Sequence, residues 1–334
     1  MEAAGAVIRA GMLRLGAGML EQLLAADNGY RGRGPDCGNG HQGEFVAYRH
    51  KTLDTVPGPV TLTRAWYHCA VCKHGFAPRD AELGVAGTSL SPGLTAMNDT
   101  AAATGPFGKA AVLLAELGGV TLTAKRVERA AEASGAAQAA AVRERASLIS
   151  SRKVTPLPPR PLPDMLYGVI DGTGVPMTAR ETAGRNGKAE DGRARTREVK
   201  LAVFFTQDTL DEGGYPVRDP RSSSYIAAFE PASVFAGLVE AEGIRRGANH
   251  VRQLTILGDG APRMRYKWFR QCGLFTGSGV VEAGCKAVIG QRLKLAGMHW
   301  AIPGADAITT LRCQQASRPE DRTWYARHNQ TRPA

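Results

Sequence analysis

The chain of 334 residues lacks three features that mark common classes of membrane and secreted protein. No apolar run approaches the length of a membrane span, so we expect no membrane partner. The N-terminus has no signal-peptide cleavage pattern. The six cysteines fall into two groups, three at or before Cys72 and three from Cys272 onward, which is not a disulfide framework. These absences favour a reducing, cytoplasmic compartment.

Positive charge is the feature in excess. The chain has 42 Lys and Arg residues against 31 Asp and Glu, a formal net charge of +11, and basic residues occur along its whole length. This balance suits a polyanionic partner, and double-stranded DNA is the first candidate. The alternative is a generally basic protein with no such partner.

The spacing of apolar residues predicts helices first and strands later. Helical spacing predicts a helix over 3–25, and two strand-like runs follow at Glu44–Arg49 and Val60–Tyr67. Residues 91–150 are rich in alanine and helical in character, and the proline-rich stretch 154–164 is typical of a linker.

Beyond the linker, the pattern predicts an α/β layer with a mixed sheet. Four runs are strand-like and two are helix-like. The strands are expected at Leu166–Ile170, Val199–Phe205, Tyr225–Phe229 and Leu254–Leu257, and the helices at Pro231–Arg246 and Val280–Leu295.

Two Cys/His pairs predict a structural zinc site. Cys69 and Cys72 form a Cys-x-x-Cys pair after a strand, and Cys37 and His41 lie upstream. Two such pairs joined by a short hairpin can surround a tetrahedral zinc ion, as in a zinc ribbon. His68 and His74 compete with His41 for the fourth position. A redox dithiol at Cys69 and Cys72 and the absence of any metal remain alternatives.

A pair of short helical patterns, Phe107–Leu117 and Thr123–Ala133, resembles a helix-turn-helix. The second pattern carries Lys125, Arg126 and Arg129, which are candidate DNA contacts. An ordinary helical hairpin with a solvated basic face is the alternative.

Three acidic residues are the candidate catalytic group. Asp171 and Asp259 each end an apolar run, and Glu282 lies near the start of a predicted helix. Carboxylates placed in this way can hold two divalent ions for phosphoryl transfer. A phosphatase of the haloacid-dehalogenase type is disfavoured, because Val169 and Arg263 stand where that class needs carboxylates. Polar turns and a helix-dipole acid are the plainer interpretations.

The helix of Glu282 also carries basic groups that could contact phosphates, namely Lys286, Arg292 and Lys294.

These motifs together resemble the ISKra-type insertion-sequence transposases of bacteria, which belong to the DDE class. The resemblance covers nearly the whole chain. The matching segments are Trp66–Cys69 leading into Cys72, Ile170–Pro176, Val199–Phe204, Leu257–Ala261, Gly277–Lys286, Gly290–Lys294 and Gly297–Trp300.

The resemblance implies an RNase H-like catalytic domain whose acidic triad is Asp171, Asp259 and Glu282. Two Mg²⁺ ions (or Mn²⁺) would bridge these carboxylates and a scissile phosphate. The reaction would be strand cleavage at the ends of a mobile element and strand transfer into target DNA. A homo-oligomer associated with the bacterial nucleoid in the cytoplasm is the corresponding expectation.

Five regions follow from the pattern and the resemblance. An α/β domain with an RNase H-like mixed sheet and flanking helices is preceded by a small zinc-ribbon-like β region and a helical region. The boundaries are 1–90 for the N-terminal helix and zinc-ribbon-like region, 91–153 for the helix-turn-helix-like region, 154–164 for the linker, 165–315 for the catalytic domain and 316–334 for a polar tail.

The spacing after Asp259 departs from the family. Asp259 and Glu282 are only 23 positions apart, whereas the family places a helix, a strand and a long helical insertion between them. We therefore expect an internal deletion near Ala261–Arg263, which would impair catalysis. A DNA-binding remnant without catalysis and a nuclease without element specificity are the alternative functions.

Overall fold

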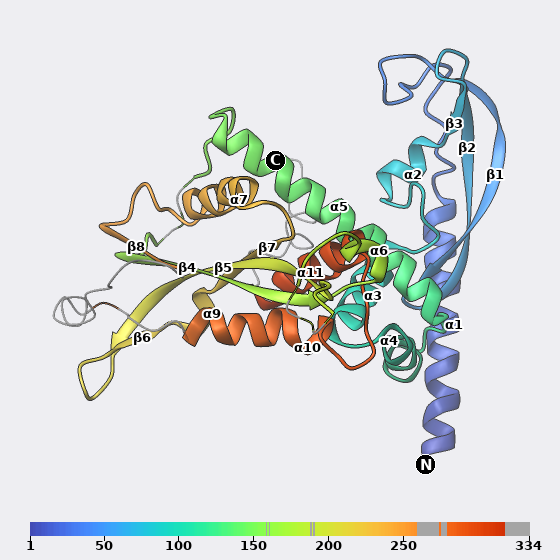
Figure 1. Cartoon of the computed structure of the whole chain (residues 1–334). Coiled ribbons are helices and arrows are strands. Elements are labelled where there is room, and N and C mark those ends of the chain that lie inside the picture. Colours follow the sequence, from blue (N-terminus) through green and yellow to red (C-terminus); the bar gives the residue numbers. More distant parts are fainter. Residues whose placement is uncertain are drawn as a thin grey trace. The chain divides into compact units, whose positions relative to one another are not determined.

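The computed structural model describes residues 1–157, 159, 161–187, 189, 191–258, 274 and 279–317, and these form two compact units (Figure 1). The first unit comprises residues 1–101 and 107–127, and the second comprises 102–106 and the described residues from 128 onward. The helical region expected at 91–153 is therefore divided between the two units.

The first unit contains a long helix and a three-stranded antiparallel sheet. Helix α1 (Glu2–Ala25) precedes strands β1 (Glu44–Thr55), β2 (Gly58–Cys69) and β3 (His74–Phe76), which are ordered β1-β2-β3. The β1–β2 hairpin is longer than the sequence indicates, because the ladder continues to the Thr55–Gly58 pair on both sides of a tight turn. The hairpin thus carries Cys69 at the far end of β2.

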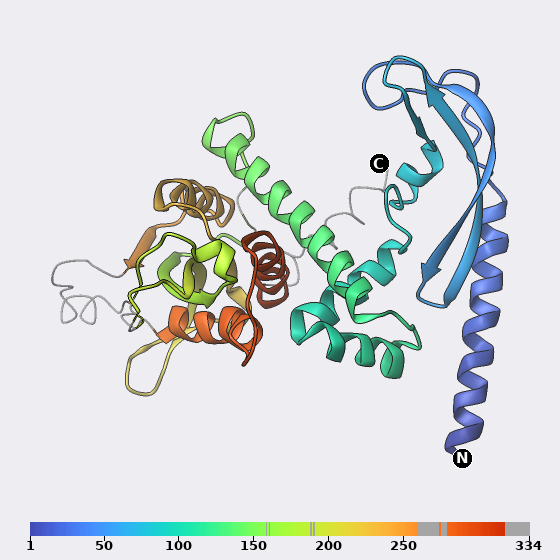
Figure 2. The same ribbon diagram turned by 45° about the vertical axis from the view of Figure 1, so that its right-hand side comes forward.

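One face of α1 covers this sheet. Ala17 is buried in a cluster with Leu53 and Leu62, and Leu20 and Leu24 pack against the same cluster. These helix positions are three or four residues apart, which places them on one side of an α-helix. Burial of this face holds α1 alongside the hairpin (Figure 2).

A series of helices follows the small sheet. Helix α2 is short, and the π-helical turn η1 continues α4 before Gly119, whose φ of +70° ends it. Glycine adopts this left-handed conformation without steric cost. The elements are α2 (Pro78–Glu82), α3 (Pro92–Thr104), α4 (Phe107–Leu113), η1 (Leu114–Gly118) and α5 (Ala124–Ser150).

The second unit contains a five-stranded mixed sheet. The central strands β4 and β5 are antiparallel. Strand β7 pairs antiparallel with the middle of β5 and β6 with its C-terminal end, and β8 runs parallel to β4. The path of the sheet is β6-β5-β4-β8, with β7 beside β5. The strands are β4 (Met165–Pro176), β5 (Thr196–Leu210), β6 (Pro216–Arg218), β7 (Ser224–Ala228) and β8 (Gln253–Gly258). The expectation of a mixed sheet is confirmed.

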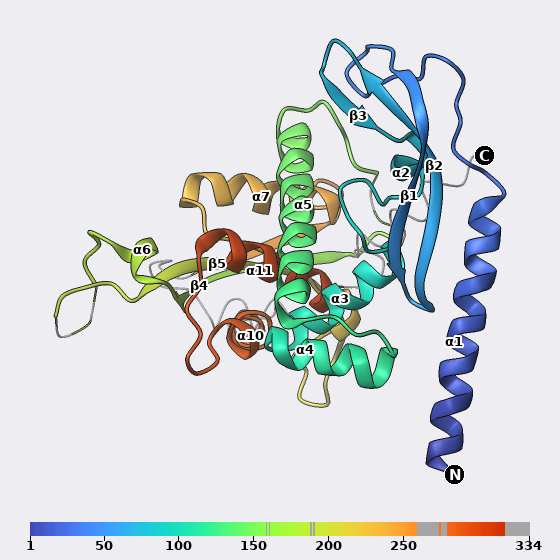
Figure 3. The same ribbon diagram turned by 90° about the vertical axis from the view of Figure 1, so that its right-hand side faces the viewer.

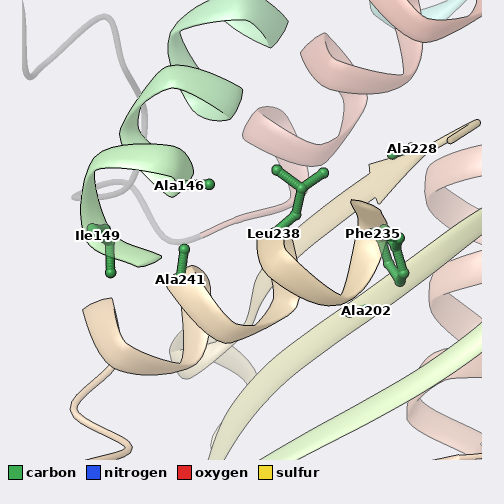
Figure 4. Close-up of a cluster of buried hydrophobic side chains, with 7 residues drawn as sticks. All are labelled: Ala146, Ile149, Ala202, Ala228, Phe235, Leu238 and Ala241. Carbon is green, nitrogen blue, oxygen red and sulfur yellow. The ribbon is translucent and has the colours of Figure 1, made fainter. Parts of the chain in front are cut away.

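Helices lie on both faces of this sheet (Figure 1). Helix α7 covers one face, and the continuous segment of α9, η3 and α10 covers the other. Buried side chains of α5, β5, β7 and α7 form a core beneath α7 (Figure 4). The helical elements are α6 (Ala179–Thr182), η2 (Pro220–Ser222), α7 (Ala232–Arg245), α9 (Gly279–Gly284), η3 (Cys285–Gly290), α10 (Gln291–Leu293) and α11 (Ile302–Ala316).

Helix α1 corrects the expectation that no apolar run approaches the length of a membrane span. It has 24 residues, and an 18-residue window within it reaches a mean hydropathy of 1.2. It is the one helix in the described part of the chain that is long and apolar enough to cross a bilayer. Only 6% of that window is buried.

Candidate functional site

Cys37, His41, Cys69 and Cys72 come together at the end of β2 in the first unit. One potential ligand atom from each lies within 4.8 Å of the others. The Sγ atoms of Cys37 and Cys72 are 3.7 Å apart, and His41 Nδ1 lies 3.2 Å from Cys72 Sγ. Two sulfurs on one tetrahedral zinc, each at about 2.3 Å, would be roughly 3.8 Å apart. The four residues therefore fit a structural metal ion such as zinc.

Two tight turns present these ligands. Strand β2 ends at Cys69, and the chain reverses through Lys73, whose φ of +52° is left-handed, before β3 begins. In the upstream turn, the N–H of Cys37 donates to the carbonyl oxygen of His41 at 2.9 Å. The carboxylate of Asp36 accepts two more backbone N–H groups of that turn. These hydrogen bonds fix the turn that carries Cys37 and His41.

This geometry bears on two alternatives that the sequence left open, namely which histidine is the fourth ligand and whether Cys69 and Cys72 form a redox dithiol. His68 and His74 are exposed and lie outside the four-residue cluster, so His41 is the histidine that completes it. Cys69 and Cys72 are both free thiols. A third thiol and an imidazole beside such a pair make a ligand set for a metal, which a redox dithiol does not need.

The thiols of the cluster do not ionise equally. Burial opposes ionisation of Cys37, but the backbone N–H groups of Asn39 and His41 stabilise its thiolate and lower the pKa to about 7. The amide of Asn39 also donates to Cys72, yet burial and the neighbouring thiols of Cys37 and Cys69 raise the pKa of Cys72. A metal cation would remove this mutual repulsion, because thiolates are its ligands.

In the second unit, Asp171 lies within β4. The sequence had indicated that it lies at the end of a strand. Its partner on β5 is Leu201, and the antiparallel ladder carries β4 on to Pro176. Strand β8 accompanies β4 only as far as the pair of Ile170 and Gly258. Asp171 is thus the first position of β4 beyond the described end of β8. Asp259, which follows Gly258 in the sequence, lies outside the described residues.

The helix that carries Glu282 packs on the face of the sheet to which Asp171 belongs. An added Cβ at Gly284 would lie 3.0 Å from the ring of Tyr225 and 3.1 Å from Leu201. Paired residues on neighbouring strands point to the same face, so Asp171 shares this face with Leu201. A glycine at position 284 therefore lets the helix approach β5 and β7 closely.

Cys285, on the helical segment that begins with Glu282's helix, contacts Asp171. Its Sγ lies 3.6 Å from Asp171 Oδ2. Burial raises the pKa of Cys285 to about 12, and the negative charges of Asp171 and Glu282 act in the same direction. The helix that carries Glu282 is thus in contact with Asp171 through this thiol. The sequence pattern predicted no role for Cys285, although it follows Glu282 by three positions on a helix.

A basic group and a hydroxyl group lie near Asp171. The ammonium group of Lys294 donates to the hydroxyl of Thr173, which lies two positions after Asp171 on the same face of β4. Lys286 is exposed on η3. Both lysines are compatible with the phosphate contacts expected of them.

Arg292 was expected to contact DNA, and the structure contradicts this. Its side chain is fully buried, and its Nε donates to the carbonyl oxygen of Ala102 at 2.8 Å. Its guanidinium lies over the ring of Trp300, 5.0 Å from the centroid. The π-helical turn η3 precedes it and shifts the facing of the side chains that follow, which α-helical spacing does not anticipate. Arg292 has a structural role.

The three basic residues at the start of α5 differ from one another. Lys125 and Arg129 are exposed. Arg126 forms an ion pair with Asp54 on β1, and its guanidinium also donates to Ser89 Oγ at 2.9 Å. Arg126 therefore ties the first turn of α5, which belongs to the first unit, to the small sheet, and its charge is partly neutralised there.

Comparison with known proteins adds no assignment to these sites. No family model matches the chain, and no curated protein matches it.

Proposed function

We propose that the chain descends from DDE-class transposases and that its second unit is an RNase H-like domain. The support is the order of strands. Three antiparallel strands, β4, β5 and β7, are followed by a helix and by β8, which returns parallel to β4 on its other side. This is the arrangement on which an RNase H-like domain is built, with helices on both faces.

The observation that carries the proposal is the contact between Asp171 on β4 and Cys285, which lies three positions after Glu282 on the same helical segment. Asp171 and Cys285 are 114 positions apart in the sequence, and the packing of α9 on β4 and β5 brings them to one face. Asp259 belongs to the proposed triad on sequence grounds, since it directly follows the residue that pairs with Ile170. Mg²⁺ or Mn²⁺ held by these carboxylates would polarise a scissile phosphate and activate the attacking oxygen.

DNA would bind through the exposed basic residues of both units. Lys125 and Arg129 in α5, Lys286 in η3 and Lys294 after α10 are the proposed phosphate contacts. The Cys/His cluster would hold zinc as a structural ion, because its thiols and imidazole match the ligands that zinc prefers.

A DNA-binding remnant without catalysis is the second candidate function. Leu254 and Ile256 on β8 are 44% and 51% exposed, and β8 pairs only with β4 within the described part of the sheet. Apolar side chains on an edge strand are what the loss of a neighbouring segment would leave. This favours the interpretation that a deletion after Asp259 has weakened catalysis.

One assay distinguishes the two functions. Purified protein is incubated with duplex DNA carrying the element's own ends, with Mg²⁺ or with EDTA, and nicked and joined products are separated on a denaturing gel. We expect Mg²⁺-dependent nicking for the transposase. Binding that weakens with salt but yields no nick in Mg²⁺ or Mn²⁺ would establish the remnant. Equal cutting of unrelated duplexes would indicate a nuclease without element specificity.

The exposed and buried basic residues should behave differently on substitution. Lys286→Ala should remove one phosphate contact. The slope of the logarithm of the DNA-binding constant against the logarithm of salt concentration should then fall in magnitude by about one, and the melting temperature should not change. Arg292→Ala should destabilise the second unit by about 1–3 kcal/mol, since it removes a buried hydrogen-bonded group. Thermal unfolding and DNA binding at several salt concentrations measure both. A changed salt slope in folded Arg292→Ala would contradict the structural role of that residue.

A further inference from the structure

Both oxygens of the Asp171 carboxylate have a hydrogen-bond partner. Oδ1 accepts the backbone N–H of Gly172 at 2.7 Å. Oδ2 lies 3.6 Å from Cys285 Sγ, and a cysteine thiol is protonated at neutral pH, so Cys285 donates and the carboxylate accepts. The first contact is local, whereas the second comes from a segment 114 positions away in the sequence. Together they fix the orientation of the carboxylate.

The backbone departs from α-helical geometry at Cys285. Helix α9 ends at Gly284, and the π-helical turn η3 begins at Cys285 and continues to Gly290. Single π-helical turns inside helices are rare and frequently lie at functional sites. Here the turn starts with the residue whose thiol contacts Asp171. The π-helical turn is therefore a second observation, independent of the contact itself, that singles out this position.

The segment that carries Cys285 is anchored on the sheet. Ile289 in η3 and Leu293 in α10 are fully buried. Helix α10, which continues η3, lies on the opposite side of β4 and β5 from α7 (Figures 1 and 3). A side chain on an anchored segment loses little further conformational entropy when it forms a hydrogen bond. Cys285 can thus hold the carboxylate at small cost.

The other common uses of a cysteine do not fit Cys285. It forms no disulfide with any described cysteine. It belongs to no group of three potential metal ligands, since the group found within the described residues is the Cys/His cluster of the first unit. Cys313 on α11 is buried and acts as a small apolar side chain, whereas Cys285 is half-buried and contacts a carboxylate. The remaining role is to orient that carboxylate.

We propose that Cys285 is a positioning residue, whose thiol orients the carboxylate of Asp171 for the divalent ion. This role rests on the proposed function, because it belongs to the same site. Each carboxylate oxygen has two lone pairs, so both oxygens of Asp171 keep one for a cation. Groups that hydrogen-bond to a metal ligand fix its orientation, and their loss typically lowers metal affinity about 10–100-fold.

Binding of Mn²⁺ to the whole, zinc-loaded chain tests this role, followed by the electron paramagnetic resonance of the free ion. Cys285→Ala removes the donor and should weaken Mn²⁺ binding at least tenfold. Cys285→Ser keeps a donor at the same position and should restore most of the affinity. Cys313→Ala is the matched control and should bind Mn²⁺ as the wild type does. Cys313 lines a cavity together with residues of α7, which covers the opposite face of the sheet.

The S–H stretching band in the Raman spectrum reports the contact without any added Mn²⁺. The difference between the wild type and Cys285→Ala isolates the band of this thiol. A hydrogen bond to a carboxylate weakens the S–H bond and lowers its frequency. The band should therefore move to higher frequency in Asp171→Ala, because the acceptor is removed. A purely structural role of Cys285 would leave the band where it is.

Folding is checked by the melting temperature and zinc content, which should be equal in all variants. If Cys285→Ala is misfolded, Cys285→Val serves as the second variant without a donor. The role of Cys285 is overturned, with the metal site intact, if Asp171→Asn weakens Mn²⁺ binding and folded Cys285→Ala does not. It is also overturned if Cys285→Ser binds no better than Cys285→Ala. Unchanged Mn²⁺ binding in both Asp171→Asn and Glu282→Gln would instead remove the proposed metal site, and this role with it.

Discussion

Replacing Cys69 by serine is expected to abolish tight zinc binding and to destabilise the first unit by at least about 3 kcal/mol, because binding of a structural zinc contributes directly to folding. Cys69 is buried at the end of β2, and its Sγ accepts the N–H of Cys72 at 3.4 Å. Loss of this ligand leaves the two turns with no common ion. Zinc content by elemental analysis and the thermal unfolding of the whole chain measure the effect.

Histidine variants provide the control for this prediction. His41→Gln should reduce zinc affinity strongly, whereas His68→Gln and His74→Gln should bind zinc as the wild type does, because only His41 belongs to the cluster. Equal losses in all three variants would contradict this ligand assignment. One bound zinc per wild-type chain is required; protein that is folded and metal-free after purification with zinc would refute the site.

The pH dependence of zinc binding follows from the thiols. The pKa of Cys37 is lowered to about 7 from the ordinary value of 9.0, so its thiolate persists down to neutral pH and is protonated below it. Protons compete with the metal for the same sulfur. Zinc affinity should therefore decline as pH falls through 7 towards 5, and a titration with a zinc-selective chelator at several pH values would show it.

Asp171→Asn is expected to reduce Mg²⁺-dependent nicking by at least about a hundredfold, because a metal-binding carboxylate is replaced by a neutral amide of the same shape. Glu282→Gln should have a similar effect. Glu240→Gln is the matched control, since Glu240 is an exposed glutamate on α7, which covers the opposite face of the sheet. The control should nick DNA as the wild type does.

A direct measurement of metal binding keeps this prediction testable if the chain cleaves slowly. Mn²⁺ binding can be followed by the electron paramagnetic resonance of the free ion. It should weaken in Asp171→Asn and in Glu282→Gln, and remain unchanged in Glu240→Gln. If neither acidic variant alters Mn²⁺ binding or nicking, these two carboxylates do not form a shared metal site.

Local patterns in the sequence predicted much of the fold. The helix expected over 3–25 is α1, and the strands expected around Leu166, Val199, Tyr225 and Leu254 are β4, β5, β7 and β8. Period and residue type report such elements because they reflect which face of an element is buried. The predicted ends of the strands were less accurate, because the ladder between β4 and β5 extends both strands through residues with no apolar alternation.

Helix α11 was not predicted at all. Its buried side includes Gly304 and Ala307, small residues that allow neighbouring elements to approach closely. Gly135 on α5 faces the backbone of Ala307, and a Cβ added at Gly135 would lie 2.4 Å from the carbonyl oxygen of Ala307. Small and polar residues give a weak apolar period, so this helix is defined by what packs on it. Pro303 in its first turn was the available signal.

The sequence by itself determined the three cysteines of the Cys/His cluster and the identity of the acidic candidates, because spacing along the chain and ligand chemistry are local properties. Tertiary structure alone decided that His41 completes the cluster, that the helix of Glu282 packs on the face of the sheet that holds Asp171, and that Arg292 is buried. It also left one apolar side of α1 in solvent. The physical reason is that burial and facing depend on which distant segments pack together, and the order of residues does not state those contacts.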